Sequence, residues 1–389
     1  MQLQLPEPSI DAQMASRSLQ TLIANDIRHN SGWIPFARYM ELALYAPGLG
    51  YYSGGSAKLG KDGDFTTAPE ITALFGQSVA RVAADLMRQS APQIMEFGAG
   101  TGKLAFDILT ELRDAGVPLH RYLIVELSGE LRARQQERLR GFPQVQWLDR
   151  LPDAFSGVVV GNEVLDAMPV SLVVKTEQGW KERGVGLSGV SARSFAWRDR
   201  PVDQALVAQI PDADALPVGY LTEVHPVAAG FMQSVARMLR AGHAASGHGG
   251  AALFFDYGFP AREYYLDQRE RGTLMCHYRH HAHDDPFFLP GLQDITAHVD
   301  FTAMAQAALD GGLDLLGYSS QAAFLIDAGI GELLQRTPVD DERRYLPLAN
   351  AMQKLVSPAE MGELFKALVV GIHTALPERF TRNDRSARL

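Results

Sequence analysis

The stretch Gln93-Ile94-Met95-Glu96-Phe97-Gly98-Ala99-Gly100-Thr101-Gly102 decides the fold. Residues 93–97 are mostly apolar, three glycines alternate over 98–102, and apolar side chains then recur at helical spacing from Leu104 to Leu112. This order predicts a strand, a tight turn and a helix. Glycine is needed where a turn takes positive φ or where a ligand touches the backbone, and the N-terminus of the following helix offers free N–H groups to a polar ligand.

A second acid follows the next predicted strand. Residues 122–125 are apolar and end at Glu126. Ligands of open α/β sheets bind at the carboxyl ends of the strands, so we expect the carboxylate of Glu126 to lie beside the glycine turn. A carboxylate in that place accepts hydrogen bonds from both hydroxyls of a ribose. The turn and the acid together predict a site for a nucleoside ligand.

The spacing of the glycines separates two kinds of nucleoside site. A dinucleotide fingerprint requires Gly-x-Gly-x-x-Gly, but the residue three after Gly100 is Lys103. The pattern present, acid-x-Gly-x-Gly-x-Gly, resembles motif I of the class I S-adenosylmethionine-dependent methyltransferases. Glu96 suits that cofactor, which carries a sulfonium and an ammonium group and no pyrophosphate. On spacing alone, a dinucleotide site and a purely structural turn remain alternatives.

Length and composition bound the answer more loosely. The 389 residues are 46% hydrophobic, which allows a large core in two domains or in one domain with large insertions. A net charge of −9 argues against a general nucleic-acid surface. A single cysteine, Cys276, fits a reducing compartment, and no apolar stretch is long enough to span a membrane. Since no targeting pattern is present, we expect a cytoplasmic protein.

Two further segments are candidates for cofactor contacts. Residues 47–69 contain six glycines together with aromatic residues, which argues for an ordered lid over the glycine turn and makes Asp64 and Thr66 candidate contacts. An ordinary surface loop is the alternative. Asp149 follows a third predicted strand and is a candidate for holding the adenine amino group, while a solvent-facing aspartate is equally compatible with its position.

The fourth strand, 158–160, leads into Asn162, Glu163 and Asp166. Their place in the sheet predicts that these side chains face the transferable methyl group. The two acids, three residues apart, are expected on one side of a short helical turn. A carboxylate pair holds a guanidinium and supports loss of its proton, with Asn162 orienting one acid. The alternative is that Asn162 caps the next helix and the acids occupy its first turn.

A cluster of histidines comes later in the chain, at positions 277, 280, 281 and 283. Imidazole is a common metal ligand, but no cysteine completes a zinc pattern and methyl transfer requires no metal. We therefore expect no metal ion and predict that His280, His281 and His283 lie on a loop facing the acceptor. A plain surface loop is the alternative.

The chain resembles the MidA family of methyltransferases, bacterial relatives of the mitochondrial complex I assembly-factor arginine methyltransferase. The resemblance runs almost end to end and rests on long motifs in fixed order. They include IPFARYMELALYAPGLGYY (34–52), KDGDFTTAPEITALFGQ (61–77), EFGAGTGKLAFDIL (96–109), GNEVLDAMPV (161–170), FFDYG (254–258) and YRHHAHDDPFFLPGLQDITAHVDF (278–301).

The resemblance implies an α/β class I methyltransferase fold, with a Rossmann-like sheet, an N-terminal helical lid and insertions. We expect a helical region and lid over 1–90 and a methyltransferase domain over 91–389, with insertions at about 170–220 and 259–300. S-adenosylmethionine is the implied donor and an arginine in a respiratory complex I subunit the implied acceptor. Gly98, Gly100 and Gly102 carry over as cofactor-binding residues, and Glu163 and Asp166 as candidates for catalysis. A non-catalytic, cofactor-binding assembly factor and a nicotinamide-dependent oxidoreductase are the competing functions.

Overall fold

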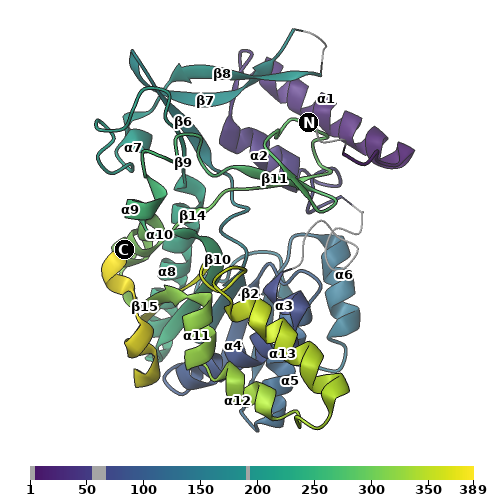
Figure 1. The fold of residues 1–389 in the computed structure, drawn as a ribbon, viewed down its shortest axis with the longest axis vertical. Coiled ribbons are helices and arrows are strands. Elements are labelled where there is room, and N and C mark those ends of the chain that lie inside the picture. Colours follow the sequence, from purple (N-terminus) through teal and green to yellow (C-terminus); the bar gives the residue numbers. More distant parts are fainter. Residues whose placement is uncertain (1–4, 55–66, 190–192) are drawn as a thin grey trace. The chain divides into compact units, whose positions relative to one another are not determined.

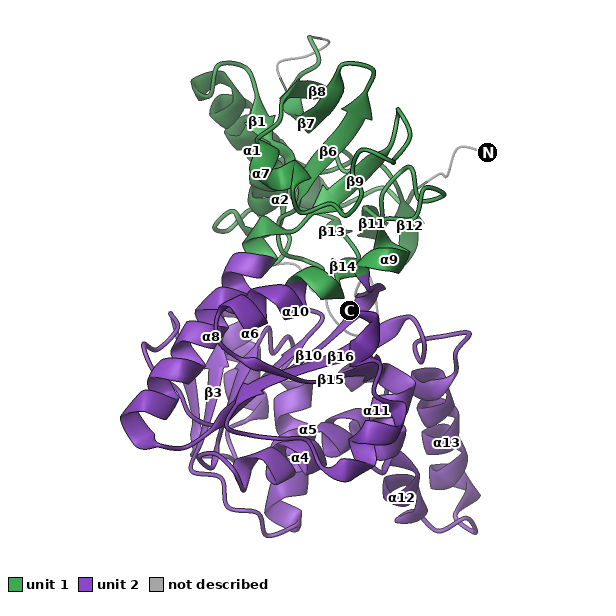
Figure 2. Cartoon of the chain, turned by 90° about the vertical axis from the view of Figure 1, so that its left-hand side faces the viewer, with its two compact units in different colours: residues 1–65, 165–228, 261–303 green, residues 66–164, 229–260, 304–389 purple. Residues whose placement is uncertain are grey.

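The computed structural model describes residues 5–54, 67–189 and 193–389 (Figure 1). The chain forms two compact units, each built from three stretches (Figure 2). Unit 1 comprises 1–65, 165–228 and 261–303, and unit 2 comprises 66–164, 229–260 and 304–389. The segment 66–90, which the sequence-based division joins to the N-terminal region, belongs to unit 2. The predicted boundary between two domains at residue 90, with insertions at about 170–220 and 259–300, stays a prediction.

Unit 2 is organised around one sheet with the strand order β15-β16-β10-β5-β2-β3-β4. The strands are β2 (Gln93–Phe97), β3 (Arg121–Val125), β4 (Val145–Leu148), β5 (Val158–Asn162), β10 (Gly250–Phe259), β15 (Asp314–Ser320) and β16 (Phe365–Ile372). From β10 to β4 the neighbours are parallel, and β16 is antiparallel to both β10 and β15. The predicted α/β fold with a Rossmann-like sheet is confirmed.

Helices cover this sheet because their apolar residues fall on one face. They are α3 (Ala68–Ile71), α4 (Ala73–Met87), α5 (Lys103–Asp114), α6 (Gly129–Arg138), α11 (Gln321–Asp327), α12 (Ile330–Gln335) and α13 (Glu342–Val356), with the 3-10 turns η1 (Glu378–Asn383) and η2 (Ser386–Arg388). Leu74, Val79 and Leu86 of α4 are buried and join Ile94 and Val158 of the strands in one core cluster. Helices α8 (Pro226–Ser246) and α10 (Phe301–Asp310) begin in unit 1 and continue in unit 2.

The strand order places a topological switch between β2 and β5. From β2 the chain proceeds through β3 to β4 on one side, and from β5 to β10 on the other. In an open α/β sheet the ligand crevice lies at the carboxyl ends of the two strands that flank such a switch. The glycine turn follows β2, and Glu163 follows β5. Unit 2 therefore brings both predicted motifs to the same edge of the sheet.

Unit 1 holds an antiparallel sheet ordered β1-β7-β6-β9, with β8 on β7. Its strands are β1 (Ile34–Pro35), β6 (Ser171–Thr176), β7 (Gly179–Leu187), β8 (Phe195–Pro201) and β9 (Leu221–Val224). Strands β6 and β7 form a hairpin, with Thr176 paired to Gly179. Two helices, α1 (Ile10–His29) and α2 (Phe36–Tyr45), pack on this sheet. Unit 1 also contains α7 (Gln204–Val207), α9 (Ala261–Tyr264), β14 (Val299–Asp300) and a small sheet of β11 (Met275–Tyr278), β12 (His281–His283) and β13 (Asp294–Thr296).

A buried polar network stabilises unit 1. The carboxylate of Glu223, fully buried, accepts hydrogen bonds from the Tyr264 hydroxyl at 3.0 Å and from the backbone N–H groups of Thr273 at 2.8 Å and Leu274 at 3.0 Å. Nε2 of His225 lies 3.1 Å from the same tyrosine hydroxyl. These hydrogen bonds connect β9 to α9 and to the residues that precede β11. The bonding groups are distant in sequence, so tertiary packing brings them together.

His225 makes stability depend on pH in a defined direction. Burial, followed by the charge of His298, lowers the pKa of His225 from 6.5 to about 4. Above pH 6.5 the imidazole is neutral in both states, but as the pH falls toward 4 only the unfolded chain takes the proton. We expect unit 1 to lose about 2 kcal/mol from this residue between pH 7 and pH 5.

Urea unfolding at the two pH values measures this loss. His225→Gln should weaken the structure at pH 7 but flatten its pH dependence. Equal slopes for the wild type and His225→Gln would contradict the assignment.

Candidate active site

The glycine turn has the backbone geometry that its sequence predicts. Gly98, Gly100 and Gly102 have φ values of +63°, +51° and +79°, a region that side chains other than glycine rarely occupy. Gly102 is the N-cap of α5, and its N–H donates to the carbonyl of Ala99 at 2.7 Å. A Cβ on Gly98 would lie 3.2 Å from Cγ2 of Val164 in the segment after β5. The turn therefore lies directly against the end of the neighbouring strand.

Glu96 lies on the packed face of the sheet. The residue is 1% exposed, and its carboxyl group accepts a hydrogen bond from the Tyr122 hydroxyl at 2.7 Å. Burial raises the pKa of Glu96 to about 8, while the Tyr122 hydrogen bond opposes the shift and the charge of Glu126 adds to it. Burial therefore favours the protonated form of this carboxyl group, in contrast to the negative charge expected from the motif. Its contact with the cofactor stays a prediction.

Glu126 stands at the carboxyl end of β3 and is 9% exposed. One of its oxygens accepts from the backbone N–H of Ser128 at 2.8 Å, and the other from Nε2 of Gln135 at 2.8 Å. The carboxylate has further lone pairs, as ribose hydroxyls would require. Sequence reasoning missed Gln135 because a glutamine among the Arg and Glu residues of α6 is typical of a solvated helix face.

The segment after β5 differs from the sequence-based expectation. No helix forms over 163–170, so the short helical turn and the alternative of a helix cap at Asn162 are both wrong. The physical cause is the backbone of Glu163, whose φ is +53° and whose N–H donates to the carbonyl of Phe255 on β10 at 2.8 Å. Oδ2 of Asp256 accepts a hydrogen bond from the N–H of Val164 at 3.1 Å. Sequence reasoning did not identify Asp256 as part of this site.

Asn162 and Glu163 nevertheless interact. Nδ2 of Asn162 donates to Oε1 of Glu163 at 2.9 Å, which is the orienting contact that the sequence suggested. The amide oxygen of Asn162 is buried and has no hydrogen-bond partner within the part of the chain that the structure describes. An unpaired buried acceptor suits a ligand with N–H donors. The ammonium group of S-adenosylmethionine is such a donor, so the residues at this edge of the sheet fit that cofactor.

Asp166 belongs to unit 1, unlike Glu163. It is 5% exposed, and its carbonyl accepts from the N–H of Ala297 at 3.0 Å. Close by, the Tyr52 hydroxyl donates to Oδ1 of the buried Asp294 at 3.0 Å, and the rings of Tyr45 and Tyr52 stack with centroids 5.5 Å apart. Burial raises the pKa of both tyrosines, and the charges of Asp294 and Asp166 raise it further. Unit 1 thus places two buried acids beside two aromatic rings.

The three predicted histidines lie on or beside one hairpin. Strands β11 and β12 pair with Tyr278 opposite His281, and Arg279 and His280, both at positive φ, form the two-residue turn between them. His280 and His281 are exposed, whereas Nδ1 of His283 accepts from the N–H of Asp285 at 3.3 Å. In the described ranges, no group of three or more His, Cys, Asp or Glu residues is arranged to hold a metal ion.

The remaining candidates have less defined surroundings. The Asp149 side chain is 83% exposed and pairs with Arg132 of α6. This exposure favours the solvent-facing alternative, and an adenine contact stays a prediction. Asp64 and Thr66 lie outside the described residues.

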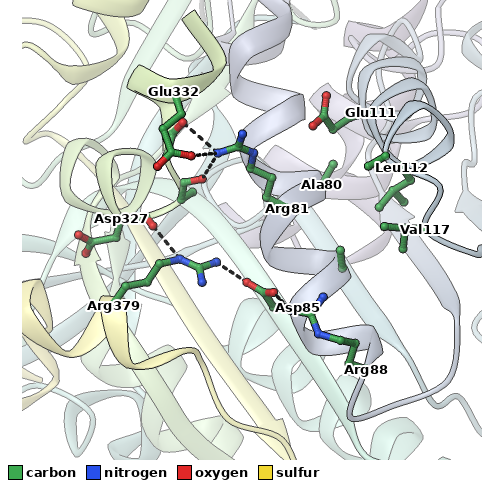
Figure 3. A pocket seen from close by; sticks show the side chains of 14 residues that line it. Ala80, Arg81, Asp85, Arg88, Glu111, Leu112, Val117, Asp327, Glu332 and Arg379 are labelled. Atoms are coloured by element: carbon green, nitrogen blue, oxygen red, sulfur yellow. Dashed lines mark hydrogen bonds and ion pairs between the residues drawn. The ribbon is translucent and has the colours of Figure 1, made fainter. Parts of the chain in front are cut away.

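A cavity of about 380 Å³ lies elsewhere in unit 2, between the C-terminal parts of α4 and α5 and the α11–α12 connection (Figure 3). These helix ends precede β2 and β3, so the cavity is at the amino ends of the strands, away from the glycine turn. Its arginines are already paired: Arg81 with Glu332 at 2.9 Å, and both Arg88 and Arg379 with Asp85. We assign it a structural role in joining the helices.

A Rossmann-like sheet with an acid-x-Gly-x-Gly-x-Gly turn at its switch point defines the class of S-adenosylmethionine-dependent methyltransferases. The model of the family described as "Putative S-adenosyl-L-methionine-dependent methyltransferase" matches residues 74–319. The chain belongs to this family, which confirms the predicted cofactor and methyltransferase class. In the described part of the chain, no helix is long and apolar enough to cross a bilayer.

Individual relatives agree with this assignment. The mitochondrial protein arginine methyltransferase NDUFAF7 of Danio rerio is 30% identical over 375 residues, covering 86% of this chain and 83% of the relative. Its counterpart in Rattus norvegicus is 28% identical over 381 residues, covering 89% and 83%. A crystal structure from Burkholderia thailandensis, described as a "likely methyl transferase" and bound to S-adenosyl-homocysteine, is 51% identical with a TM-score of 0.91, covering 99% of this chain and 100% of that one.

Proposed function

We propose that this methyltransferase modifies an arginine side chain of a protein acceptor, in a subunit of respiratory complex I. The observation that carries the proposal is the carboxylate of Glu163, held by Asn162 at the switch point of the sheet. A carboxylate is the group that pairs with a guanidinium and accepts its proton. The resemblance to NDUFAF7 proteins, named as protein arginine methyltransferases, supports the same acceptor.

In this proposal the cofactor lies along the carboxyl ends of β2, β3 and β5. Gly98, Gly100 and Gly102 let the backbone approach it closely, since a side chain on Gly98 would reach Val164. Glu126 accepts from the ribose hydroxyls, and the amide oxygen of Asn162 accepts from the ammonium group. Glu96 supports the turn from within the sheet. Asp149, Asp64 and Thr66 remain candidates for the adenine and lid contacts.

When bound, S-adenosylmethionine supplies a methyl carbon whose bond to sulfur breaks as the acceptor nitrogen attacks. The electron pair of that bond stays on sulfur, and the methylated nitrogen loses a proton. Glu163 orients the attacking N–H group and takes this proton, which it then releases to solvent. Asn162 acts by holding the carboxylate of Glu163 through its Nδ2 hydrogen bond. The contribution of such a base is typically 10²–10⁴-fold in rate.

The second acid is proposed to act on the acceptor. Asp166 and Asp294 are buried beside the stacked rings of Tyr45 and Tyr52 in unit 1. Carboxylates and aromatic faces together recognise a planar cation such as a guanidinium. His280, His281 and His283 on the β11–β12 hairpin would contact residues that flank the acceptor arginine.

Mass spectrometry of the respiratory subunits from a deletion strain tests the acceptor. We expect a methylated arginine in a complex I subunit to disappear in the deletion and to return with the wild-type gene, but not with Glu163→Gln. If Glu163→Gln restores complex I assembly without restoring the methyl group, the protein acts as a cofactor-binding assembly factor. If no arginine methylation differs between the strains, this acceptor is wrong.

Isothermal titration separates the remaining competitor. The protein should bind S-adenosylhomocysteine and give no heat with NADH. Binding of NADH alone would favour an oxidoreductase.

A further inference from the structure

Helix α6 contains one buried residue, Gln135, in a mostly polar sequence. Its side chain makes three hydrogen bonds. Nε2 donates to the carbonyl of Gly100 at 2.9 Å and to Oε2 of Glu126 at 2.8 Å, and Oε1 accepts from Nε1 of Trp147 at 2.9 Å. Both N–H groups and the oxygen of the amide are thus engaged, at zero solvent exposure.

The three partners come from three neighbouring strands. Gly100 is in the turn after β2, Glu126 follows β3, and Trp147 is in β4. One side chain therefore fixes the carboxyl ends of all three strands relative to each other. The amide orientation is determined by chemistry, because its opposite would point Oε1 at a carbonyl and a carboxylate, and the NH₂ group at an indole N–H.

We propose that Gln135 is a positioning residue for the cofactor: it holds the carboxylate of Glu126 and the Gly100 segment in the arrangement that receives the ribose. This inference rests on the proposed role of Glu126. No other standard side chain of this length offers two donors and one acceptor in a plane. Glutamate lacks the donors and would repel Glu126, and asparagine is shorter by one methylene group.

The surroundings of Glu126 give this role a measurable consequence. Burial raises the pKa of Glu126, and the opposing effects are the backbone N–H of Ser128, the Gln135 amide and the backbone N–H of Leu127. From β2, the carboxyl group of Glu96 also interacts electrostatically with Glu126. Removing the Gln135 donor should therefore raise the pKa of Glu126 further. Protonation removes the capacity of Glu126 to accept two hydroxyl hydrogen bonds. As the pH is lowered, a variant without the Gln135 donor should therefore lose cofactor binding at a higher pH than the wild type does.

Titration of the full-length protein with S-adenosylhomocysteine between pH 5.5 and pH 8, as a working range, tests the proposal. Gln135→Leu keeps a similar volume without hydrogen bonds and should raise Kd by about 10–100-fold at neutral pH. It should also move the loss of binding on the acid side to higher pH. The matched control is Arg134→Leu on the same helix, which removes an ion pair with Glu130 and should change Kd by less than about twofold.

Trp147→Phe provides a second variant in case Gln135→Leu does not fold. It removes the indole donor while leaving Gln135 and Glu126 in place, and should raise Kd by about 3–10-fold. An unchanged Kd and pH profile in a folded Gln135→Leu protein would overturn the inference, as would equal effects of Gln135→Leu and Arg134→Leu.

Glu126→Gln distinguishes the role of Glu126 in cofactor binding from the positioning role of Gln135. If Glu126→Gln weakens binding but Gln135→Leu does not, the cofactor site stands and the positioning role is wrong. If Glu126→Gln leaves Kd unchanged, the proposed role of Glu126 is wrong and the inference about Gln135 fails with it.

Discussion

Gly98→Val is expected to abolish cofactor binding, with Kd for S-adenosylhomocysteine at least about 100-fold higher than in the wild type. Gly98 has a φ of +63°, which a β-branched residue adopts only with strain, and its Cβ would already lie 3.2 Å from Cγ2 of Val164. The two γ-methyl groups of valine add further volume beside Val164, which this Cβ already contacts closely. Isothermal titration measures the loss.

The chain offers a matched control for backbone strain. Gly116, just after α5, has a φ of +66°, and a Cβ on it would meet no atom within 4 Å. Gly116→Val therefore imposes comparable strain without crowding the glycine turn, and should leave Kd unchanged within about twofold while lowering the thermal midpoint. Retention of normal binding by Gly98→Val, or an equal loss in both variants, would show that the turn does not receive the cofactor.

Glu163→Gln is expected to separate binding from catalysis. Glutamine keeps the shape of the side chain, and its amide oxygen can still accept from Nδ2 of Asn162, which now donates to Glu163 at 2.9 Å. It carries no charge for a guanidinium and takes no proton. Kd for S-adenosylhomocysteine should stay within about twofold, while methyl transfer should fall by about 10²–10⁴-fold.

Transfer of a labelled methyl group to extract from the deletion strain measures this loss. Asp166→Asn should likewise keep cofactor binding and lose activity. Glu177→Gln, in the exposed β6–β7 turn, is the charge-matched control and should retain full activity. Full activity of Glu163→Gln would remove this residue from the mechanism, and loss of cofactor binding would move it into the cofactor site.

The sequence predicted those parts of the site that are determined locally. The strand, glycine turn and helix over 93–112 are readable because apolar spacing and the need for positive φ are properties of a few consecutive residues. The family resemblance then extended this local pattern to the class of enzyme and its cofactor.

Other features depend on partners that are distant in sequence. The segment at Glu163 was predicted to be helical, and this prediction was wrong. Its left-handed backbone is stabilised by Phe255 and Asp256 on β10, more than 90 residues away, which the local sequence does not indicate. Gln135 was missed because its burial comes from Gly100 and Trp147.

The amino-acid sequence by itself determined the glycine turn, the first four strands along the chain and the class of enzyme, since each follows from local periodicity or from a continuous motif. Only the tertiary structure decided which polar side chains are buried and which atoms they bond. The physical reason is that a buried hydrogen bond depends on two groups meeting in space, and the sequence around either group does not contain the other.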